Sequence, residues 1–394
     1  MVDDHSMANG ERFVKVAADL RPTLVERAAQ CEDERRLPSE TVADLLEAGL
    51  FHLRVPVEHG GHGCDIRTSV RVAAEVAKGC ASTAWVMNLL NLGTGVAAGM
   101  LPPEGVAELF GSEELPMICG VHSLTGTATP AEGGYVVEGS WGFASGSLHS
   151  SWAMLGVRVL DAKGVQASTG LAWVPIAELT IKDTWHVAGM KGTGSNTLVV
   201  DHVFVPEYRI MLSPDEFARQ LQHSPLAPAF AVFLLGPLLG ATESILQGVL
   251  ANGGRGGGHY FKWQRQSDSP VFLEAIGEAA MLIETAWLHT DRAVATLDNE
   301  ALAGPMDYPT AARGQGDAAC AVAALRRAAS LLINVAGASA YAESSPLQRA
   351  WRDLEVGAHH AGLNIALSFE LYGRVLAGEP SNNPFFGRDA RVLS

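Results

Sequence analysis

The feature that most constrains this chain is its division into three segments of different character. Helix-type patterns fill the sequence to about Glu113, short β-type runs separated by Gly, Asp and Lys continue to Leu212, and helix-type patterns return until Gly378. The last segment has only short breaks, which favours long helices packed as a bundle. The sequence therefore predicts an α+β fold that is mostly α, with an N-terminal helical domain, a central antiparallel β domain and a C-terminal four-helix bundle. We place these domains at 1–113, 114–212 and 213–394.

Local signals support this order. The spacing of apolar residues predicts two helices over 67–78 and 82–98. Runs rich in Val, Leu and aromatic residues predict strands over 152–160 and 197–205. The sequence Ser-Pro-Asp-Glu at 213–216 is a typical helix start, with a capping serine followed by Pro and two acids in the first turn.

Composition excludes several classes of function. The formal net charge is −15 and no basic run is present, so binding to nucleic acid or to anionic lipid is not expected. The N-terminus has no basic and apolar signal sequence, and no uninterrupted apolar stretch has the length of a membrane span. The cysteines lack a C-x-x-C spacing, which predicts no metal site and suits a reducing cytoplasm. They are Cys31, Cys64, Cys80, Cys119 and Cys320.

Motifs for nucleotides and for nucleophilic catalysis are missing from the sequence. There is no G-x-S-x-G, H-E-x-x-H or G-x-x-x-x-G-K-[ST] pattern. The segment 189–194 (GMKGTG) resembles a phosphate loop, but it lies between β-type runs and opens no helix. The chain therefore shows no site for NAD(P)H.

The most distinctive segment runs from Gly139 to Trp152. Trp141, Phe143 and Ser145 alternate, so we expect them on one face of a strand. Gly146 then allows close approach of a planar ligand to the serine hydroxyl and to exposed backbone N–H groups. A β-core strand that ends in a serine turn would explain the same residues.

Two further segments carry candidate residues. Thr193, Gly194 and Ser195 follow a tryptophan in a small, hydroxyl-rich stretch that suits either a ligand-facing turn or a simple hairpin loop. On a continuous helix, His360 would share an apolar stripe with Val356 and Leu363, as a catalytic group or as a core histidine.

Taken together, these segments resemble the acyl-CoA dehydrogenase superfamily from about Arg35 to Gly378. More closely they resemble its two-component flavin-dependent monooxygenases, which hydroxylate phenols, steroid-ring intermediates and polyketides. The residues that carry the resemblance are the Gly-Gly loop of 58–63, the Ser-Thr-Ala-Trp stretch of 82–85, the Ser145-Gly146 strand end, the Gly189–Ser195 loop, and Arg352-Asp353 with His360.

The resemblance implies an enzyme that uses O2 and reduced FMN or FAD through a C4a-hydroperoxyflavin. It implies that Ser145 bonds flavin N5 and that His360 assists proton delivery. Cofactor contacts are implied for Trp141, Phe143, Ser145, Gly146, Thr193, Gly194, Ser195 and Arg255. It also implies a separate NAD(P)H:flavin reductase and a homotetramer or homodimer.

The sequence departs from the phenol hydroxylases on the helix after the Ser-Thr-Ala-Trp stretch. Several of them carry a histidine there, whereas this chain has Asn91 and no histidine. Asn91, His122 and Ser123 are the candidates for contact with the substrate. A polycyclic or polyketide-like substrate, or N-hydroxylation, therefore fits better than a simple phenol.

Two other functions remain open from the sequence. An acyl-CoA dehydrogenase or oxidase would need a carboxylate base, and Glu343 or Glu370 could serve. A non-catalytic relative would have no reason to keep Ser145, Thr193 and His360 together.

Overall fold

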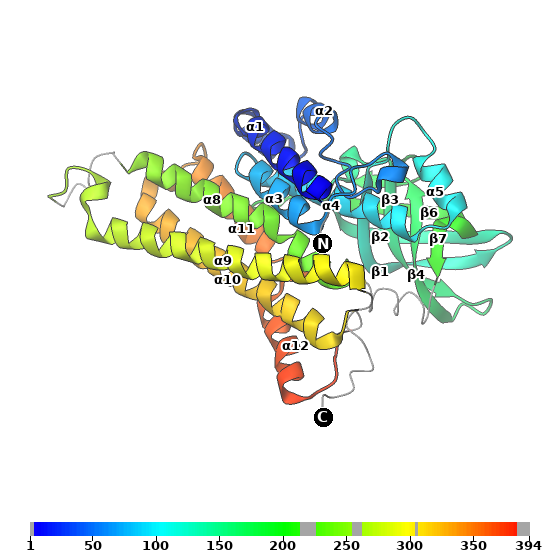
Figure 1. The fold of residues 1–394 in the computed structure, drawn as a ribbon. Coiled ribbons are helices and arrows are strands. Elements are labelled where there is room, and N and C mark those ends of the chain that lie inside the picture. Colours follow the sequence, from blue (N-terminus) through cyan, green and yellow to red (C-terminus); the bar gives the residue numbers. More distant parts are fainter. Residues whose placement is uncertain (1–3, 213–225, 254–261, 304–305, 384–394) are drawn as a thin grey trace.

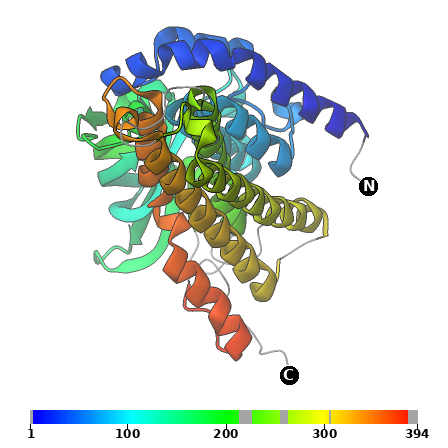
Figure 2. The same cartoon turned by 90° about the vertical axis from the view of Figure 1, so that its left-hand side faces the viewer.

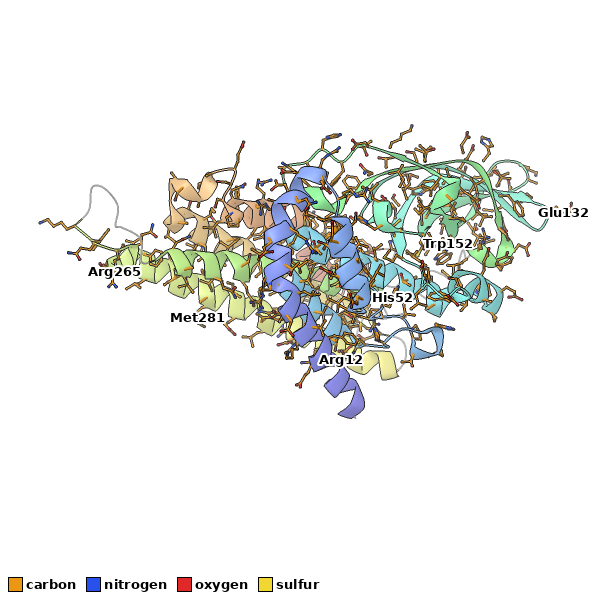
Figure 3. All side chains as sticks on the ribbon, turned by 90° about the horizontal axis from the view of Figure 1, so that it is seen from above. Arg12, His52, Glu132, Trp152, Arg265 and Met281 are labelled. Carbon is orange, nitrogen blue, oxygen red and sulfur yellow. The ribbon has the colours of Figure 1, made fainter. Side chains whose placement is uncertain are left out.

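The computed structural model describes residues 4–212, 226–253, 262–303 and 306–383. The β domain lies at one end of an elongated molecule and the long C-terminal helices extend from the other (Figure 1). Seen from above, Glu132 in the turn between the first two strands and Arg265 before the longest helix mark these opposite ends (Figure 3). The predicted order of helices, sheet and helices is confirmed.

The N-terminal group is wholly helical apart from its loops. Asp65 caps the third helix by accepting a hydrogen bond from Thr68 N (2.8 Å). The helices predicted over 67–78 and 82–98 are confirmed as α3 and α4, with small differences at their ends. The helices of this group are α1 (Asp4–Glu34), α2 (Ser39–Glu47), α3 (Ile66–Ala77), α4 (Ala81–Met100) and α5 (Pro103–Phe110).

The strands form one seven-stranded sheet in the order β5-β6-β2-β1-β3-β4-β7. Neighbouring strands are antiparallel except β1 and β3, which are parallel, so the prediction of a wholly antiparallel domain is wrong at this pair. The chain reverses after β2 and adds β3 on the far side of β1, which leaves β3 parallel to β1. The strands are β1 (Ile118–Ala131), β2 (Gly134–Ala144), β3 (Trp152–Leu160), β4 (Gln166–Pro175), β5 (Thr180–Lys182), β6 (Asn196–Pro206) and β7 (Ile210–Leu212).

The C-terminal segment is helical throughout its described parts. Figure 2 shows α1 arching over the molecule and the last helix leaving the bundle on the opposite side. The helix start predicted at 213–216 lies outside the described residues. The helices are α7 (Leu226–Phe233), α8 (Leu235–Asn252), α9 (Pro270–Ala303), α10 (Tyr308–Ala336), α11 (Pro346–Ala358) and α12 (Ile365–Ala377).

Two helical stretches, Ala229–Asn252 and α10, are long and apolar enough to cross a membrane by length and composition alone. Their most apolar windows are 78% and 56% buried inside the fold, so packing within the protein accounts for much of their apolar character.

Two apolar clusters make up the core, one centred on the bundle and one between the N-terminal helices and the sheet. Helix α4 contributes to both, because Trp85 packs in the first cluster while Val86 and Leu90 pack in the second. The helix packs against α3, α8 and β1. It therefore joins the helical and β parts of the molecule at the place where the candidate residues gather.

Candidate active site

A β-bulge near the end of β2 separates two residues that the sequence placed on one face. Trp141 pairs with Leu198 and Ala144 with Asn196, so β2 holds one residue more than β6 between these pairs. Phe143, in the bulge, has a positive φ of 64°. Its side chain is 76% exposed, whereas Trp141 is fully buried. The alternation predicted for these aromatics is wrong, because the extra residue reverses the direction of Phe143.

Trp141 belongs to the core of the β domain. Its Nε1 donates a hydrogen bond to Gly156 O (2.8 Å), and the ring fills the space beside Gly126. Because Trp141 is fully buried, it packs against the bulge as part of the core. Of the two aromatic residues beside the bulge, Phe143 is the exposed one, and its ring forms a T-shaped pair with Trp185 at 5.9 Å between centroids.

The turn after β2 is fixed by Gly146. Its φ of 76° is the left-handed conformation that favours glycine, and its N–H donates to Thr193 O (3.0 Å). A Cβ at this position would lie 3.1 Å from the side chains of Val86 and Leu90. The close approach that the sequence suggested for a ligand is therefore used by α4, which packs directly on the turn.

Three buried hydroxyl groups meet behind this turn. Ser145 Oγ and Thr193 Oγ1 both lie 2.7 Å from Ser195 Oγ. Thr193 Oγ1 also donates to Met190 O (2.7 Å). The sequence selected all three hydroxyl residues, and the structure brings them together from segments 50 residues apart.

The loop that carries Thr193 and Ser195 is held by α11. Met190 adopts a positive φ of 53°, and its N–H donates to the Asp353 carboxylate (2.5 Å). Burial raises the pKa of Asp353 to about 7. Trp185 Nε1 donates to Met190 O (2.9 Å), so the N–H and the C=O of Met190 are both bonded. Asp353 is thus a positioning residue for this loop.

Sequence reasoning missed Glu32 at the end of α1. Its carboxylate accepts hydrogen bonds from Arg349 Nε (2.8 Å) and Arg352 Nη2 (2.7 Å), and Lys191 Nζ lies 3.2 Å away. These bonds lower the pKa of Glu32 against the opposing effect of its burial. Its two arginine partners lie more than 300 residues ahead in the chain, so no local pattern marks this acid as structural.

His360 does not lie on a continuous helix. Helix α11 ends at Ala358, and His360 has extended backbone angles (φ −58°, ψ 139°) before a short 3₁₀ helix, η8 (Ala361–Leu363). Its Nδ1 accepts a hydrogen bond from Gly362 N (3.1 Å). The predicted stripe with Val356 and Leu363 is wrong, because the side chain caps η8 instead of extending from a helix.

Aromatic rings surround His360. The centroid of its ring is 5.8 Å from that of Trp85 and 5.5 Å from that of Phe230. Burial and the neighbouring His122 lower the pKa of His360 to about 4. At neutral pH the imidazole is therefore uncharged, and because Nδ1 accepts from Gly362, its proton is on Nε2.

His122 contacts Phe230 from the sheet. The pairing of β1 with β3 shifts between Val121 and Gly126, so the residues between them leave the regular ladder. His122 meets the edge of Phe230 at 6.0 Å. Its ring keeps an exposed surface, although the surrounding protein lowers its pKa. Ser123 is also exposed in this irregular stretch.

Helix α4 joins the hydroxyl groups to the histidines. Val86 faces Gly146, beside Ser145, whereas Trp85 faces His360. A Cβ on Gly357 of α11 would meet both Trp85 and the end of the Met190 side chain. The Gly189–Ser195 loop, α4 and the end of α11 therefore lie together in one region.

One predicted site residue, Asn91, has a structural role instead. Asn91 is 1% exposed, and its Nδ2 donates to Leu50 O (2.6 Å) and Met87 O (3.0 Å). These bonds fix the loop after α2 to α4. Because Asn91 is buried, we do not expect it to contact a substrate. Arg255 lies outside the described residues.

The carboxylates required by a dehydrogenase are found on the outer surface. Glu343 is exposed, and Glu370, also exposed, is bonded by Arg374 and Asn382. Neither acid lies among the residues that contact His360, Phe143 or the hydroxyl groups in the described parts of the chain.

Comparison with known proteins agrees with this geometry. The model of the acyl-CoA dehydrogenase N-terminal domain matches residues 12–108, and that of the C-terminal domain matches 233–365. The oxygenase subunit HsaA of a flavin-dependent monooxygenase from Mycobacterium tuberculosis is 30% identical over 92% of this chain and 94% of its own. The oxygenase component of an FADH(2)-dependent resorcinol hydroxylase from Rhizobium is 30% identical over 93% and 94%.

A solved structure is also closely similar. XiaF from Streptomyces, in complex with FADH2 and glycerol, has a TM-score of 0.90 and 33% identity over 98% of this chain and 99% of its own. The chain belongs to the acyl-CoA dehydrogenase family. Within it, the chain is an oxygenase component of the two-component flavin-dependent monooxygenase type, and the dehydrogenase alternative is not supported.

Proposed function

We propose that this chain binds reduced flavin supplied by a separate reductase and uses O2 to hydroxylate an aromatic or polyketide-like molecule. The observation that carries the proposal is the exposed Phe143 ring two residues before the buried Ser145 hydroxyl. A flavin ring needs a flat apolar surface and a hydrogen-bond partner at N5, and this strand end provides both. The Ser147 hydroxyl, in the same turn, is buried and has no partner among the described residues. When bound, reduced flavin supplies the electrons that activate O2.

The residues around this position have separate tasks. Phe143 and Trp185 would provide an apolar wall against one face of a bound flavin ring, and Ser145 would bond its N5. His360 is neutral at pH 7, so it acts as a hydrogen-bond donor through Nε2 or as an acceptor of a proton, and not as a stored cation.

The group formed by His360, His122, Trp85 and Phe230, called the histidine cluster below, favours an aromatic substrate. Phe230 offers a partly exposed ring backed by His360 and the buried Trp85, while His122 is an exposed polar residue. This arrangement suits a flat molecule with one polar atom near the oxidised position. The names of several relatives, among them resorcinol hydroxylase and p-hydroxyphenylacetate 3-hydroxylase, support an aromatic substrate.

The names of the relatives also bear on the cofactor and on the partner protein. The FADH2 named for the resorcinol hydroxylase and for XiaF favours FAD over FMN. The words "oxygenase component" favour a separate NAD(P)H-dependent reductase. A homotetramer or homodimer and a cytoplasmic location also belong to the proposal, and the five free cysteines suit a reducing compartment.

A flavin analysis of the purified protein tests the proposal. We expect little bound flavin after purification, tight binding of anaerobically reduced FAD, and no spectral response to acyl-CoA. Stoichiometric oxidised FAD that is bleached by an acyl-CoA would contradict the proposal and favour the dehydrogenase chemistry of the wider family.

A further inference from the structure

The three buried hydroxyl groups of the candidate site form a chain that ends on a backbone carbonyl. Thr193 Oγ1 lies 2.7 Å from Met190 O, Ser195 Oγ lies 2.7 Å from Thr193 Oγ1, and Ser145 Oγ lies 2.7 Å from Ser195 Oγ. Thr193 is 2% exposed, Ser195 3% and Ser145 8%. Ser145 is therefore the end of the chain that reaches toward the surface.

The direction of each hydrogen bond follows from the carbonyl. A carbonyl only accepts, so the single hydroxyl proton of Thr193 is donated to Met190 O. Thr193 Oγ1 must then accept from Ser195, and Ser195 Oγ must accept from Ser145. With all three bonds formed, the proton of Ser145 points inward. Its outward lone pairs can only accept a hydrogen bond.

This polarity matches one redox state of a flavin. N5 of the reduced ring carries a hydrogen and donates, whereas N5 of the oxidised ring has only a lone pair and accepts. We infer that Thr193 and Ser195, which need not touch the flavin, determine the preference of this site for reduced over oxidised flavin. The inference rests on the proposed function, because it requires Ser145 to face flavin N5.

The terminal carbonyl is held firmly enough to impose this direction. Met190 N donates to Asp353, and Met190 O accepts from Trp185 Nε1 as well as from Thr193. Asp353 thereby holds the peptide group before Met190, and Trp185 holds the peptide group after it, which contains Met190 O. Rotating that second group would break the bonds from Trp185 and Thr193 to Met190 O, so the acceptor at the end of the chain stays in place.

Oxidised flavin can bond Ser145 only if the chain loses one hydrogen bond. Ser145 can turn its proton from Ser195 to N5, which breaks the bond between the two serines, or every proton in the chain can reverse. In that second case Ser145 would donate to N5, Ser195 to Ser145 and Thr193 to Ser195, and the bond from Thr193 to Met190 O would be lost. Losing one such bond weakens binding by roughly five- to tenfold. The chain therefore raises the ratio of the dissociation constants of oxidised and reduced flavin by about that factor.

The experiment compares the affinities of the wild type and of Thr193→Val for both redox states of FAD and FMN. Valine keeps the shape of threonine, and Met190 O retains its bond from Trp185, so we expect the variant to fold. Oxidised flavin is titrated in air and reduced flavin under anaerobic conditions. Thr197→Val is the matched control, since it removes one hydroxyl of an exposed pair, Thr184 and Thr197, whose oxygens lie 2.8 Å apart.

We expect Thr193→Val to lower the oxidised-to-reduced ratio of dissociation constants by about five- to tenfold, mainly through tighter binding of oxidised flavin. Thr197→Val should leave the ratio within twofold of the wild type. A Thr193→Val ratio equal to that of the wild type, in a protein that prefers reduced flavin, would overturn the chain as its cause while leaving the proposed function intact. A wild type that binds neither flavin would instead refute the proposed function itself.

Discussion

The hydroxyl chain and the histidine cluster both contact α4. They differ in how many of their hydrogen-bonding groups have a partner within the protein. Ser145, Thr193 and Ser195 bond one another and end on a backbone carbonyl. His360 and His122 lie among aromatic rings, and the described residues offer no acceptor for the His360 Nε2 proton. The bonded hydroxyl network fixes the direction of the hydrogen bond that Ser145 can form with a ligand. The Nε2–H of His360 lies among rings and can bond different molecules. We therefore assign cofactor selection to the first region and substrate chemistry to the second.

The largest effect is expected from His360→Asn. Asparagine can still accept the Gly362 N–H that His360 Nδ1 accepts, so η8 should remain capped and the melting temperature should stay near that of the wild type. It cannot exchange a proton, so oxygen transfer should slow by roughly a hundredfold. The rate of product formation per folded molecule, measured with reduced flavin supplied, checks this.

His359→Asn is the control for that variant. His359 is exposed and its Nδ1 bonds the Glu355 carbonyl (2.7 Å), away from the aromatic cluster. Its turnover should match the wild type. If His360→Asn lowers the melting temperature and leaves turnover per folded molecule unchanged, the histidine is a core residue and the contrast between the two regions fails.

A smaller effect is expected from Ser145→Ala. The variant removes the outer end of the hydroxyl chain but leaves the bond between Thr193 and Ser195, so the fold should be retained. Oxygen consumed per product formed should rise, with hydrogen peroxide release increased by up to about tenfold. Unchanged coupling of oxygen use to product would make Ser145 a simple turn residue.

A further effect concerns stability in acid and involves His149, which belongs to neither region. Its Nε2 accepts a hydrogen bond from Leu37 N (3.2 Å), and burial with the nearby Arg36 lowers its pKa to about 4 from 6.5. The folded state resists protonation, so the stability present above pH 6.5 is lost as the pH falls toward 4.

The stability test compares the wild type with His149→Asn at pH 7 and pH 5. The wild type should lose up to about 2 kcal/mol more unfolding free energy than the variant over this range. The raised pKa of Asp353 acts in the opposite direction in both proteins, because its protonated form is favoured as the pH falls, and it cancels in the comparison. Identical losses would show that His149 is not held neutral by the fold.

Much of the fold could be predicted from the sequence because local patterns specify it. Strand β3 was predicted with its observed bounds, Trp152–Leu160, from its run of β-type residues. The bulge that separates Trp141 from Phe143 could not be predicted, since it depends on the register with β6. The break before His360 was also missed. The residues on either side continue a helical period, and only the capping bond from Gly362 reveals the turn.

The site was predictable to a similar extent. The hydroxyl residues stood out by composition, and their grouping in space follows from the pairing of β2 with β6. The roles of Glu32 and Asp353 were not predictable from spacing, because they depend on contacts between α1, α11 and the loop before β6.

The most direct test of the account is a rapid-mixing measurement on the wild type. The protein is loaded anaerobically with photoreduced FAD or FMN, with no reductase and no NAD(P)H, and is mixed with oxygenated buffer while the flavin absorbance is followed. We expect a transient spectrum that differs from those of reduced and oxidised flavin. It should decay to oxidised flavin more slowly than free reduced flavin reacts with O2. Direct conversion to oxidised flavin at the rate of the free cofactor would contradict the account.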